Sequence, residues 1–230
     1  MIEPGPAKQL RGISAYAKRF FHRQILTWFG QNKRRFPWRE TNDPYCILVA
    51  EILLQQTDAA KVSLVYPEFI QRYPDISKLA KAEPEDLQEF ISKIGLNYRA
   101  QRLVNIARDI SDKFTGRIPD SEVELMKLPG AGRYIANAVL SAAFGMRTAV
   151  VDTNIVRILE RFFGIRSQRP RARTDPELWS IAHSLLPRKQ ADCRDWNYAL
   201  IDFCALVCTH YNPKCSQCVC APHCWHFSTH

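Results

Sequence analysis

The chain has 230 residues, of which 46% are hydrophobic and 24% charged, so it is long and apolar enough to fold around a substantial core. The formal net charge of +9 favours a polyanionic partner such as nucleic acid. The longest apolar runs are too short or too interrupted to cross a bilayer and residues 1–12 carry no apolar signal core, so we expect no membrane partner and a cytoplasmic location, nucleoid-associated in a prokaryote.

Hydrophobic periodicity predicts an all-α protein, because helical spacing recurs along the whole chain and alternating strand patterns are hard to find. Proline behind an acidic residue marks three helix starts, at Asp43-Pro44, Glu83-Pro84 and Asp175-Pro176. Glycines mark expected ends at Gly95, Gly116, Gly145 and Gly164. The expected helices are 15–31, 44–56, 60–73, 84–94, 99–114, 123–128, 133–144, 153–163, 176–186 and 194–208.

The expected helix 44–56 reads PYCILVAEILLQQ and is apolar nearly all round, which is typical of a buried helix. Glu51 interrupts it. A buried carboxylate without a cationic partner favours its protonated form, so Glu51 is a candidate general acid. A glutamate at a wet edge, or one paired with an arginine, is the structural alternative. Gln55 and Gln56 end this helix, where amides can fill a gap in a base stack or simply provide polarity at a helix end.

The segment 128–157, LPGAGRYIANAVLSAAFGMRTAVVDTNIVR, combines a glycine-rich turn with an aspartate at the head of a helix. Gly130 and Gly132 let backbone N–H groups approach an anion, and the helix that begins near Arg133 points its positive dipole end the same way. Such a grip on phosphate, followed by the apolar-flanked carboxylate of Asp152, suggests an enzyme that handles DNA. The structural alternative is an αα-hairpin and an N-capping aspartate.

Five of the eight cysteines lie in the last, turn-rich segment, and crowding of this kind in a reducing compartment indicates metal rather than disulfides. Cys208, Cys215, Cys218 and Cys224 form the spacing C-x6-C-x2-C-x5-C. Four thiolates in a short loop can hold one tetrahedral zinc ion or one [4Fe–4S] cluster, and the residues alone leave both open. Cys220 falls inside the last gap and is expected not to be a ligand.

Together these segments resemble the helix–hairpin–helix (HhH-GPD) DNA glycosylases with an iron–sulfur loop, the superfamily that includes endonuclease III and the adenine glycosylase MutY. The resemblance spans roughly residues 15–224, with FPWRETNDPY, AEILLQQT, IGLNYRAQRL, LPGAGRYIANAVLSAAFG, VDTNIVR and the cysteine spacing in family order. It implies two helical lobes: a six-helix barrel with the helix–hairpin–helix over 36–146, and a second lobe from 1–35 and 147–230. It also implies a [4Fe–4S] cluster at 208–224 and, as partner of a monomer, double-stranded DNA with a mismatched or damaged base.

The resemblance carries specific roles to single residues. The catalytic aspartate falls on Asp152, which we expect to stay ionised as an N-cap and to stabilise an oxocarbenium-like sugar or orient water. Glu51 falls where MutY-like members contact the flipped base. Tyr134 stands where bifunctional members such as endonuclease III have a lysine, and a tyrosine there is typical of the thymine–guanine mismatch (MIG) branch. The loop that helps wedge the duplex open falls on Leu96, Asn97 and Tyr98. The residues expected to bind DNA are therefore Gln55, Gln56, Leu96, Asn97, Tyr98, Leu128, Gly130, Gly132 and Arg133.

The expected function is that of a monofunctional DNA glycosylase of base excision repair, without β-lyase activity. It would flip thymine or uracil out of G·T or G·U mismatches, which open more easily than Watson–Crick pairs, and leave an abasic site. Gln55-Gln56-Thr57 looks instead like MutY, so the alternative enzyme is an adenine glycosylase that lacks the C-terminal domain and acts on A·G or A·8-oxoG. A non-catalytic binder of DNA damage is the alternative from another class, and the presence of both Glu51 and Asp152 argues against it.

Overall fold

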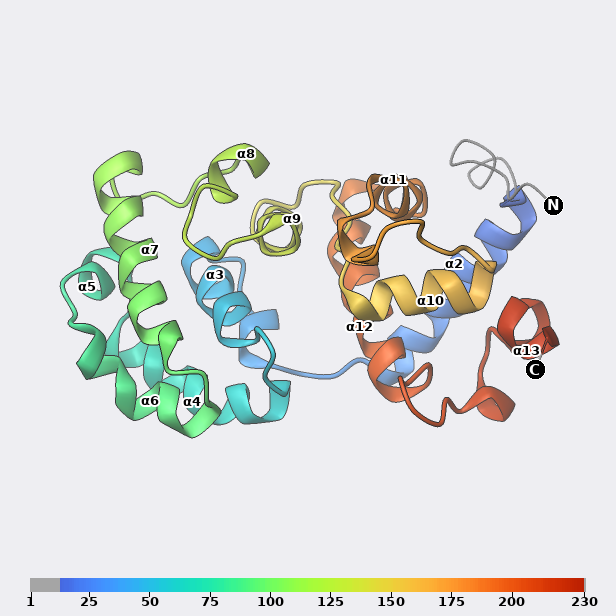
Figure 1. Cartoon of the computed structure of the whole chain (residues 1–230), viewed down its shortest axis with the longest axis horizontal. Coiled ribbons are helices and arrows are strands. Elements are labelled where there is room, and N and C mark those ends of the chain that lie inside the picture. Colours follow the sequence, from blue (N-terminus) through green and yellow to red (C-terminus); the bar gives the residue numbers. More distant parts are fainter. Residues whose placement is uncertain (1–12, 230) are drawn as a thin grey trace. The chain divides into compact units, whose positions relative to one another are not determined.

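The computed structural model describes residues 13–229, and within this range the chain contains helices, turns and loops but no strand (Figure 1). The predicted all-α fold is confirmed. The chain folds into two compact units: unit 2 is Arg35–Met146, and unit 1 joins the segment that ends at Arg34 to the one that begins at Arg147. Among the described residues, no helix has both the length and the hydropathy that crossing a membrane requires.

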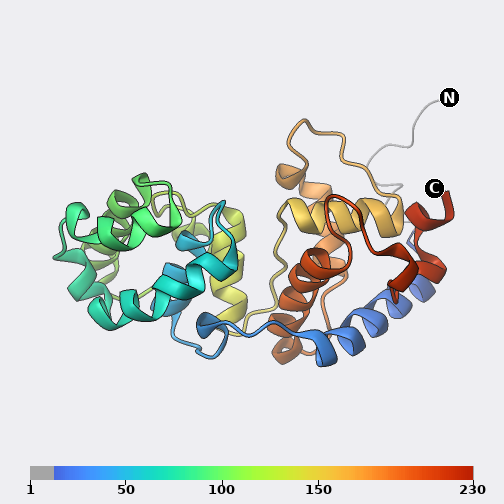
Figure 2. The ribbon, with the colours of Figure 1, turned by 90° about the horizontal axis from the view of Figure 1, so that it is seen from below.

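Unit 2 surrounds its core with helices, and Figure 2 shows them enclosing a common interior. Helix α3 contacts α4, α7 and α9, while α7 packs along α5. These helices are α3 (Pro44–Leu53), α4 (Ala59–Arg72), α5 (Ile76–Ala80), α6 (Gln88–Ile94), α7 (Tyr98–Phe114), α8 (Glu122–Leu125) and α9 (Arg133–Ala142), with 3-10 turns at Pro37–Arg39 and Pro84–Leu87.

Helix α3 begins as its sequence predicts. The Asp43 carboxylate accepts hydrogen bonds from the backbone N–H groups of Tyr45 (2.8 Å) and Cys46 (3.3 Å), and Pro44 occupies the first turn. Eight of its ten residues are buried, Glu51 among them. The helix ends at Leu53 rather than at Gln56, and the correction has a local cause: Gln56 adopts a left-handed φ of 56°, which no α-helix accommodates.

Unit 1 packs its helices around an aromatic core. The Phe21 ring lies 4.5 Å from the Phe162 ring and 5.8 Å from the Trp196 ring, between centroids. Helix α12 contacts both α2 and α10. The fully buried Asp202 on α12 accepts hydrogen bonds from the backbone N–H (2.9 Å) and Nε (2.7 Å) of Arg34, which fixes the end of the N-terminal segment. The helices are α2 (Ala15–Asn32), α10 (Thr153–Phe163), α11 (Pro176–Ser184), α12 (Cys193–Leu206) and α13 (Trp225–Thr229).

The expected helix boundaries differ from the observed ones where short turns intervene. Helix α10 spans the predicted range, capped by Asp152 and closed by Gly164 in the left-handed region. The short helices α5 and α13 were not expected, and the predicted helix 123–128 ends at Leu125 because the chain turns into the hairpin before α9. The predicted helix 84–94 begins as the 3-10 turn Pro84–Leu87 before α6.

Candidate active site and DNA interface

The carboxylate of Asp152 is held at both oxygens at the start of α10. Its Oδ1 accepts hydrogen bonds from the backbone N–H groups of Asn154 (2.9 Å) and Ile155 (2.8 Å), and its Oδ2 accepts one from Asn154 Nδ2 (2.7 Å). The residue is half-buried and follows the buried run Ala149, Val150 and Val151. This arrangement fixes the direction of a negative charge without removing it from solvent, as a group that stabilises developing positive charge requires.

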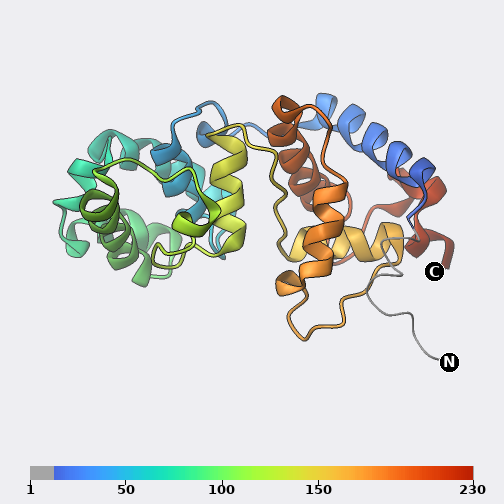
Figure 3. The same ribbon diagram turned by 90° about the horizontal axis from the view of Figure 1, so that it is seen from above.

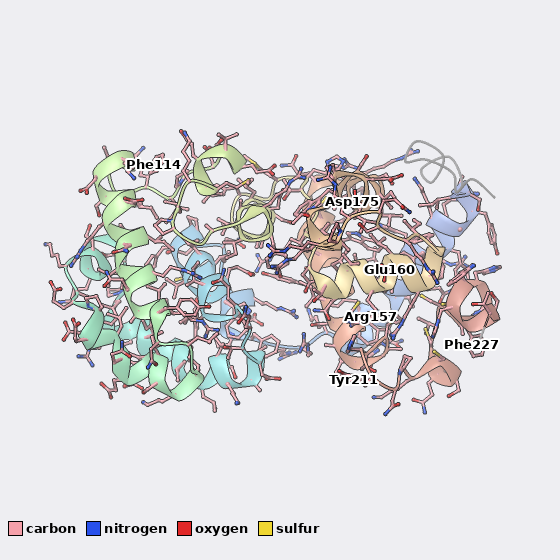
Figure 4. All side chains as sticks on the ribbon, in the orientation of Figure 1. Phe114, Arg157, Glu160, Asp175, Tyr211 and Phe227 are labelled. Carbon is pink, nitrogen blue, oxygen red and sulfur yellow. The ribbon has the colours of Figure 1, made fainter. Side chains whose placement is uncertain are left out.

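A chain of hydrogen bonds connects Asp152 to the end of α12. The Asn154 side chain that donates to Asp152 accepts from Arg157 Nη2 at 3.0 Å. Arg157, labelled on α10 in Figure 4, donates through Nε to the carbonyl of Cys208 (2.9 Å) and through Nη2 to that of Cys204 (3.1 Å). Neither Asn154 nor Arg157 was among the residues expected to have a role at the site. The only signal for them was their place in VDTNIVR, two and five positions after the capping aspartate.

The four expected cysteine ligands lie in the loop that follows α12. Cys215 begins the 3-10 turn Cys215–Gln217, Cys218 ends it, and Cys224 follows the turn Ala221–His223. Arg161 connects the first and last of the four, because its Nη1 donates to Cys208 Sγ (3.6 Å) and its carbonyl accepts from Cys224 Sγ (3.3 Å). Within residues 13–229, no three His, Cys, Asp or Glu side chains are arranged to hold a single metal ion.

Cys218 and Cys220 behave differently although they are two residues apart. The Cys220 thiol hydrogen-bonds to the Cys218 sulfur, which lowers the pKa of Cys218. The same hydrogen bond, together with burial, raises the pKa of Cys220. Cys220 is also 2% exposed, whereas the other four cysteines of this segment are half-buried. Cys220 is thus the donor of this hydrogen bond, and the sulfur of Cys218 is its acceptor.

The hairpin consists of α8, a glycine-rich turn and α9. Gly130 has a φ of 73°, a conformation that glycine adopts without strain, and the N–H of Ala131 donates to the carbonyl of Leu128 at 3.0 Å. Leu128 itself is buried, so its side chain belongs to the core beneath the turn. Gly132 is exposed at the N-cap of α9. Arg133 forms an ion pair with Glu122 of α8 (2.8 Å). The turn therefore presents the backbone N–H groups at a helix N-terminus, where an anion is favoured.

Glu51 and Tyr134 lie on neighbouring helices of unit 2. Glu51 is 8% exposed on α3, and Tyr134 is half-buried in the first turn of α9. The two helices pack against each other, and Figure 3 shows α9 (yellow-green) beside α3 (blue). The prediction that Glu51 sits in a buried helix is confirmed. Asp152, the expected catalytic aspartate, belongs to unit 1.

The turn after α3 and the loop before α7 present different side chains to solvent. Gln56 is exposed, and so are Leu96 (φ 61°, 37% exposed), Asn97 and Tyr98. Gln55 is engaged inside unit 2 instead: its Nε2 donates to the carbonyl of Gly130 (3.0 Å), and its Oε1 accepts from Arg102 Nη1 (2.5 Å). Gln55 therefore differs from its neighbour, because both ends of its amide already have protein partners.

Comparison with known proteins identifies the family. Residues 49–183 match the HhH-GPD superfamily base excision DNA repair proteins. The chain belongs to this superfamily. It is 39% identical over 198 residues to thymine-DNA glycosylase of Aeropyrum pernix, covering 85% of this chain and 89% of the relative. It is 38% identical over 210 residues to thymine/uracil-DNA glycosylase of Pyrobaculum aerophilum, covering 90% of each. The solved structure of a thermostable thymine-DNA glycosylase superposes with a TM-score of 0.87 at 36% identity, covering 94% of this chain and 98% of that one.

These comparisons confirm the resemblance that the motifs predicted, including the branch. The relatives above are named for thymine or uracil, and each is matched over nearly its whole length. Tyr134 is the residue that first indicated this branch. DNA is accordingly the partner of this chain. The exposed glycine and the helix N-terminus of the hairpin suit an anion.

Proposed function

We propose that this protein is a monofunctional DNA glycosylase that removes thymine or uracil paired with guanine and leaves an abasic site. The observation that carries the proposal is Tyr134 in the first turn of the hairpin helix α9, in a chain whose relatives are named thymine- and thymine/uracil-DNA glycosylases. A phenol cannot form a Schiff base with the sugar, so the base leaves by hydrolysis and the strand stays intact.

Asp152 is proposed as the catalytic carboxylate. Breaking the bond between C1′ and the base nitrogen leaves positive charge on the sugar, and a carboxylate fixed by three hydrogen bonds stabilises that charge without reorganising. The oxygen of a water molecule then bonds to C1′, and the base departs with a proton. Asp152 is suited to orient this water through Oδ2, which accepts only one hydrogen bond and keeps acceptor capacity for another donor.

Glu51 and Tyr134 are proposed to act on the flipped base. Glu51 is buried in α3, and a carboxylate with restricted access to water can hold a proton and share it with a base. Tyr134 would line the pocket and exclude a purine by its bulk. The DNA backbone would be bound by the hairpin turn, through Gly130, Gly132 and the N-terminus of α9.

We propose that Cys208, Cys215, Cys218 and Cys224 hold a [4Fe–4S] cluster. The donor set fits: four thiols lie in one loop, and Arg161 connects the first to the last and donates a hydrogen bond to the sulfur of Cys208. When bound, the cluster would cross-link the loop and so stabilise the end of α12. We also propose that the barrel spans 36–146 and that 1–35 and 147–230 form the second lobe, although residues 1–12 and 230 lie outside the described residues.

The test is a base-release assay on a panel of duplexes with G·T, G·U, A·G and A·8-oxoG, with and without alkali. Alkali-dependent breaks at thymine or uracil opposite guanine are expected, because an abasic site breaks in alkali and a monofunctional enzyme does not cut the strand. Breaks at adenine would replace this proposal with an adenine glycosylase. Binding without any base release would indicate a damage-binding protein.

A further inference from the structure

Two arginines on α7 hold the residues on either side of Gln56. Arg102 Nη1 donates to Gln55 Oε1 at 2.5 Å, and Arg99 Nη2 donates to Thr57 Oγ1 at 2.7 Å. The arginines are three positions apart and thus share one face of their helix. Gln56, between the two held residues, is exposed and has a left-handed φ of 56°.

Arg102 also contacts the start of its own helix and the hairpin. Its guanidinium carbon lies 4.6 Å from the centre of the ring of Tyr98, the first residue of α7. It also covers Gly130 of the hairpin so closely that a methyl group there would overlap the guanidinium. Gln55 connects Arg102 to the hairpin, because the same side-chain amide that accepts from Arg102 donates to the carbonyl of Gly130 (3.0 Å). One side chain therefore touches the turn 55–57, the hairpin and the exposed Tyr98 at the start of α7.

Arg99 supports the same turn from inside the core. It is fully buried, and its Nε and Nη1 have no hydrogen-bond partner within residues 13–229. The hydrogen bond from this buried guanidinium to the Thr57 hydroxyl is charge-assisted, so it holds Thr57 strongly. Thr57 in turn donates to the carbonyl of Ile94 (3.4 Å), at the start of the loop that carries Leu96.

We propose that Arg102, supported by Arg99, is a positioning residue that locks the turn 55–57 against the hairpin and so holds Gln56 outward for insertion into opened DNA. Left-handed backbone is unfavourable for glutamine, and the structure keeps it only where neighbouring contacts enforce it. Fixing the residues on both sides of Gln56 supplies that enforcement. The inference rests on the proposed function, since it concerns how this family member opens a base pair.

The experiment compares Arg102→Met and Arg102→Lys with the matched control Arg108→Met. Arg108 lies on the same helix and its loss changes the charge equally, but it contacts the carbonyls of Ala80 (3.1 Å) and Ala82 (3.2 Å) and the Glu83 carboxylate. The probe is a duplex with 2-aminopurine beside a 2′-fluoro-deoxyuridine opposite guanine, a nucleotide that resists base release. The fluorescence of 2-aminopurine rises when the stack opens.

At saturating protein, both Arg102 variants are expected to lower the opening equilibrium about tenfold, the effect of losing a hydrogen bond to a charged group. Arg108→Met is expected to change nothing. Lysine does not rescue, because one ammonium cannot bond Gln55 while lying flat on Tyr98. The salt dependence of binding should be the same for all variants. A variant that is only less stable has fewer folded molecules, but at saturating protein those molecules would still open the DNA as the parent does. The fluorescence at saturation therefore separates an effect on positioning from an effect on stability.

The proposal is overturned if Arg102→Lys opens DNA like the parent and Arg102→Met lowers the slope of log Kd against log salt by about one, since that pattern marks a phosphate contact.

Gln55→Met removes the hydrogen-bond partner of Arg102 instead, and it should reproduce the loss of opening. The double variant Gln55→Met with Arg102→Met should lose no more opening than either single variant. Additive losses of opening in the double variant would contradict the proposal that Arg102 acts through Gln55. The same opening measurement on a duplex with a tetrahydrofuran abasic site opposite guanine requires no target base. The inference about Arg102 can therefore be tested even if the proposed substrate is wrong.

Discussion

Asp152→Asn separates the catalytic role of this residue from its role as a helix cap. The asparagine oxygen can still accept from the backbone N–H groups of Asn154 and Ile155, and asparagine caps helices as well as aspartate does. The new amide nitrogen, however, meets Asn154 Nδ2, which donated to Oδ2 at 2.7 Å. Losing this hydrogen bond lowers the free energy of unfolding by about 1 kcal/mol, or roughly 2–4 °C in melting temperature for a chain of this size.

The effect on base release is expected to be far larger than the effect on stability. The substitution removes the negative charge that stabilises the sugar in the transition state, and losing one preorganised electrostatic group slows catalysis about 10³-fold, or about 4 kcal/mol in the barrier. Binding to a duplex with an abasic analogue should be retained, because the hairpin and the turn 55–57 belong to unit 2. The assay is single-turnover release of uracil from G·U, with thermal unfolding and binding measured on the same samples.

Asp175→Asn is a matched control in the same unit. Asp175, labelled in Figure 4, caps α11 through the N–H of Glu177 (2.9 Å), and its second oxygen accepts from Ser167 Oγ (2.7 Å). It should show the same small loss of stability and full base release. The assignment of Asp152 fails if its variant releases uracil within tenfold of the parent rate, or if the Asp175 variant is slowed as strongly.

Three further predictions follow from single residues. Cys218→Ala should abolish the yellow-brown absorption and iron content of the purified protein, while Cys220→Ala should retain both; equal loss in the two variants would place Cys220 among the ligands. The parent should give no borohydride-trapped DNA adduct, and Tyr134→Lys should gain nicking of abasic DNA, which a gel detects; an adduct with the parent would reveal another amine nucleophile. Burial lowers the pKa of His22 below its usual 6.5, so the unfolded chain binds a proton that the folded chain resists and stability falls as pH drops below 6.5. His22→Phe should flatten this dependence in urea unfolding between pH 5 and 7.5, and an unchanged slope would contradict the assignment.

Helix starts and the buried character of α3 could be predicted because they depend on neighbours in sequence. Asp43 and Asp152 cap their helices through N–H groups two and three residues ahead, so the signal and its effect lie in the same short segment. Gly164 ends α10 for an equally local reason, a left-handed φ of 71°. The cysteine spacing and the hairpin motif are local in the same way, and both led to the family.

The partners of long polar side chains could not be predicted, because they are set by residues far away in sequence. Arg102 is 47 positions from Gln55, and Arg157 is 51 positions from Cys208. A glutamine at a helix end is equally suited to contact DNA or to brace a turn, since both uses require the same amide. The fold decides between them by placing a donor and an acceptor beside Gln55, and nothing in the sequence around Gln55 signals either.

A side chain with a partner inside the protein can still contact DNA. Whether it changes partner depends on how much the internal interaction contributes to the free energy of the folded protein. Arg133 pairs with Glu122, but both side chains are more than one-third exposed, and such pairs contribute about 0–1 kcal/mol. A DNA phosphate can replace that carboxylate with no net loss. Gln55 is different, because moving its side chain breaks two hydrogen bonds at once. The Arg102 guanidinium, which lies against Gly130, then loses its hydrogen bond to Gln55. We therefore expect Arg133 to exchange its partner on binding DNA, and Gln55 to keep both of its own while Gln56 reaches the base stack.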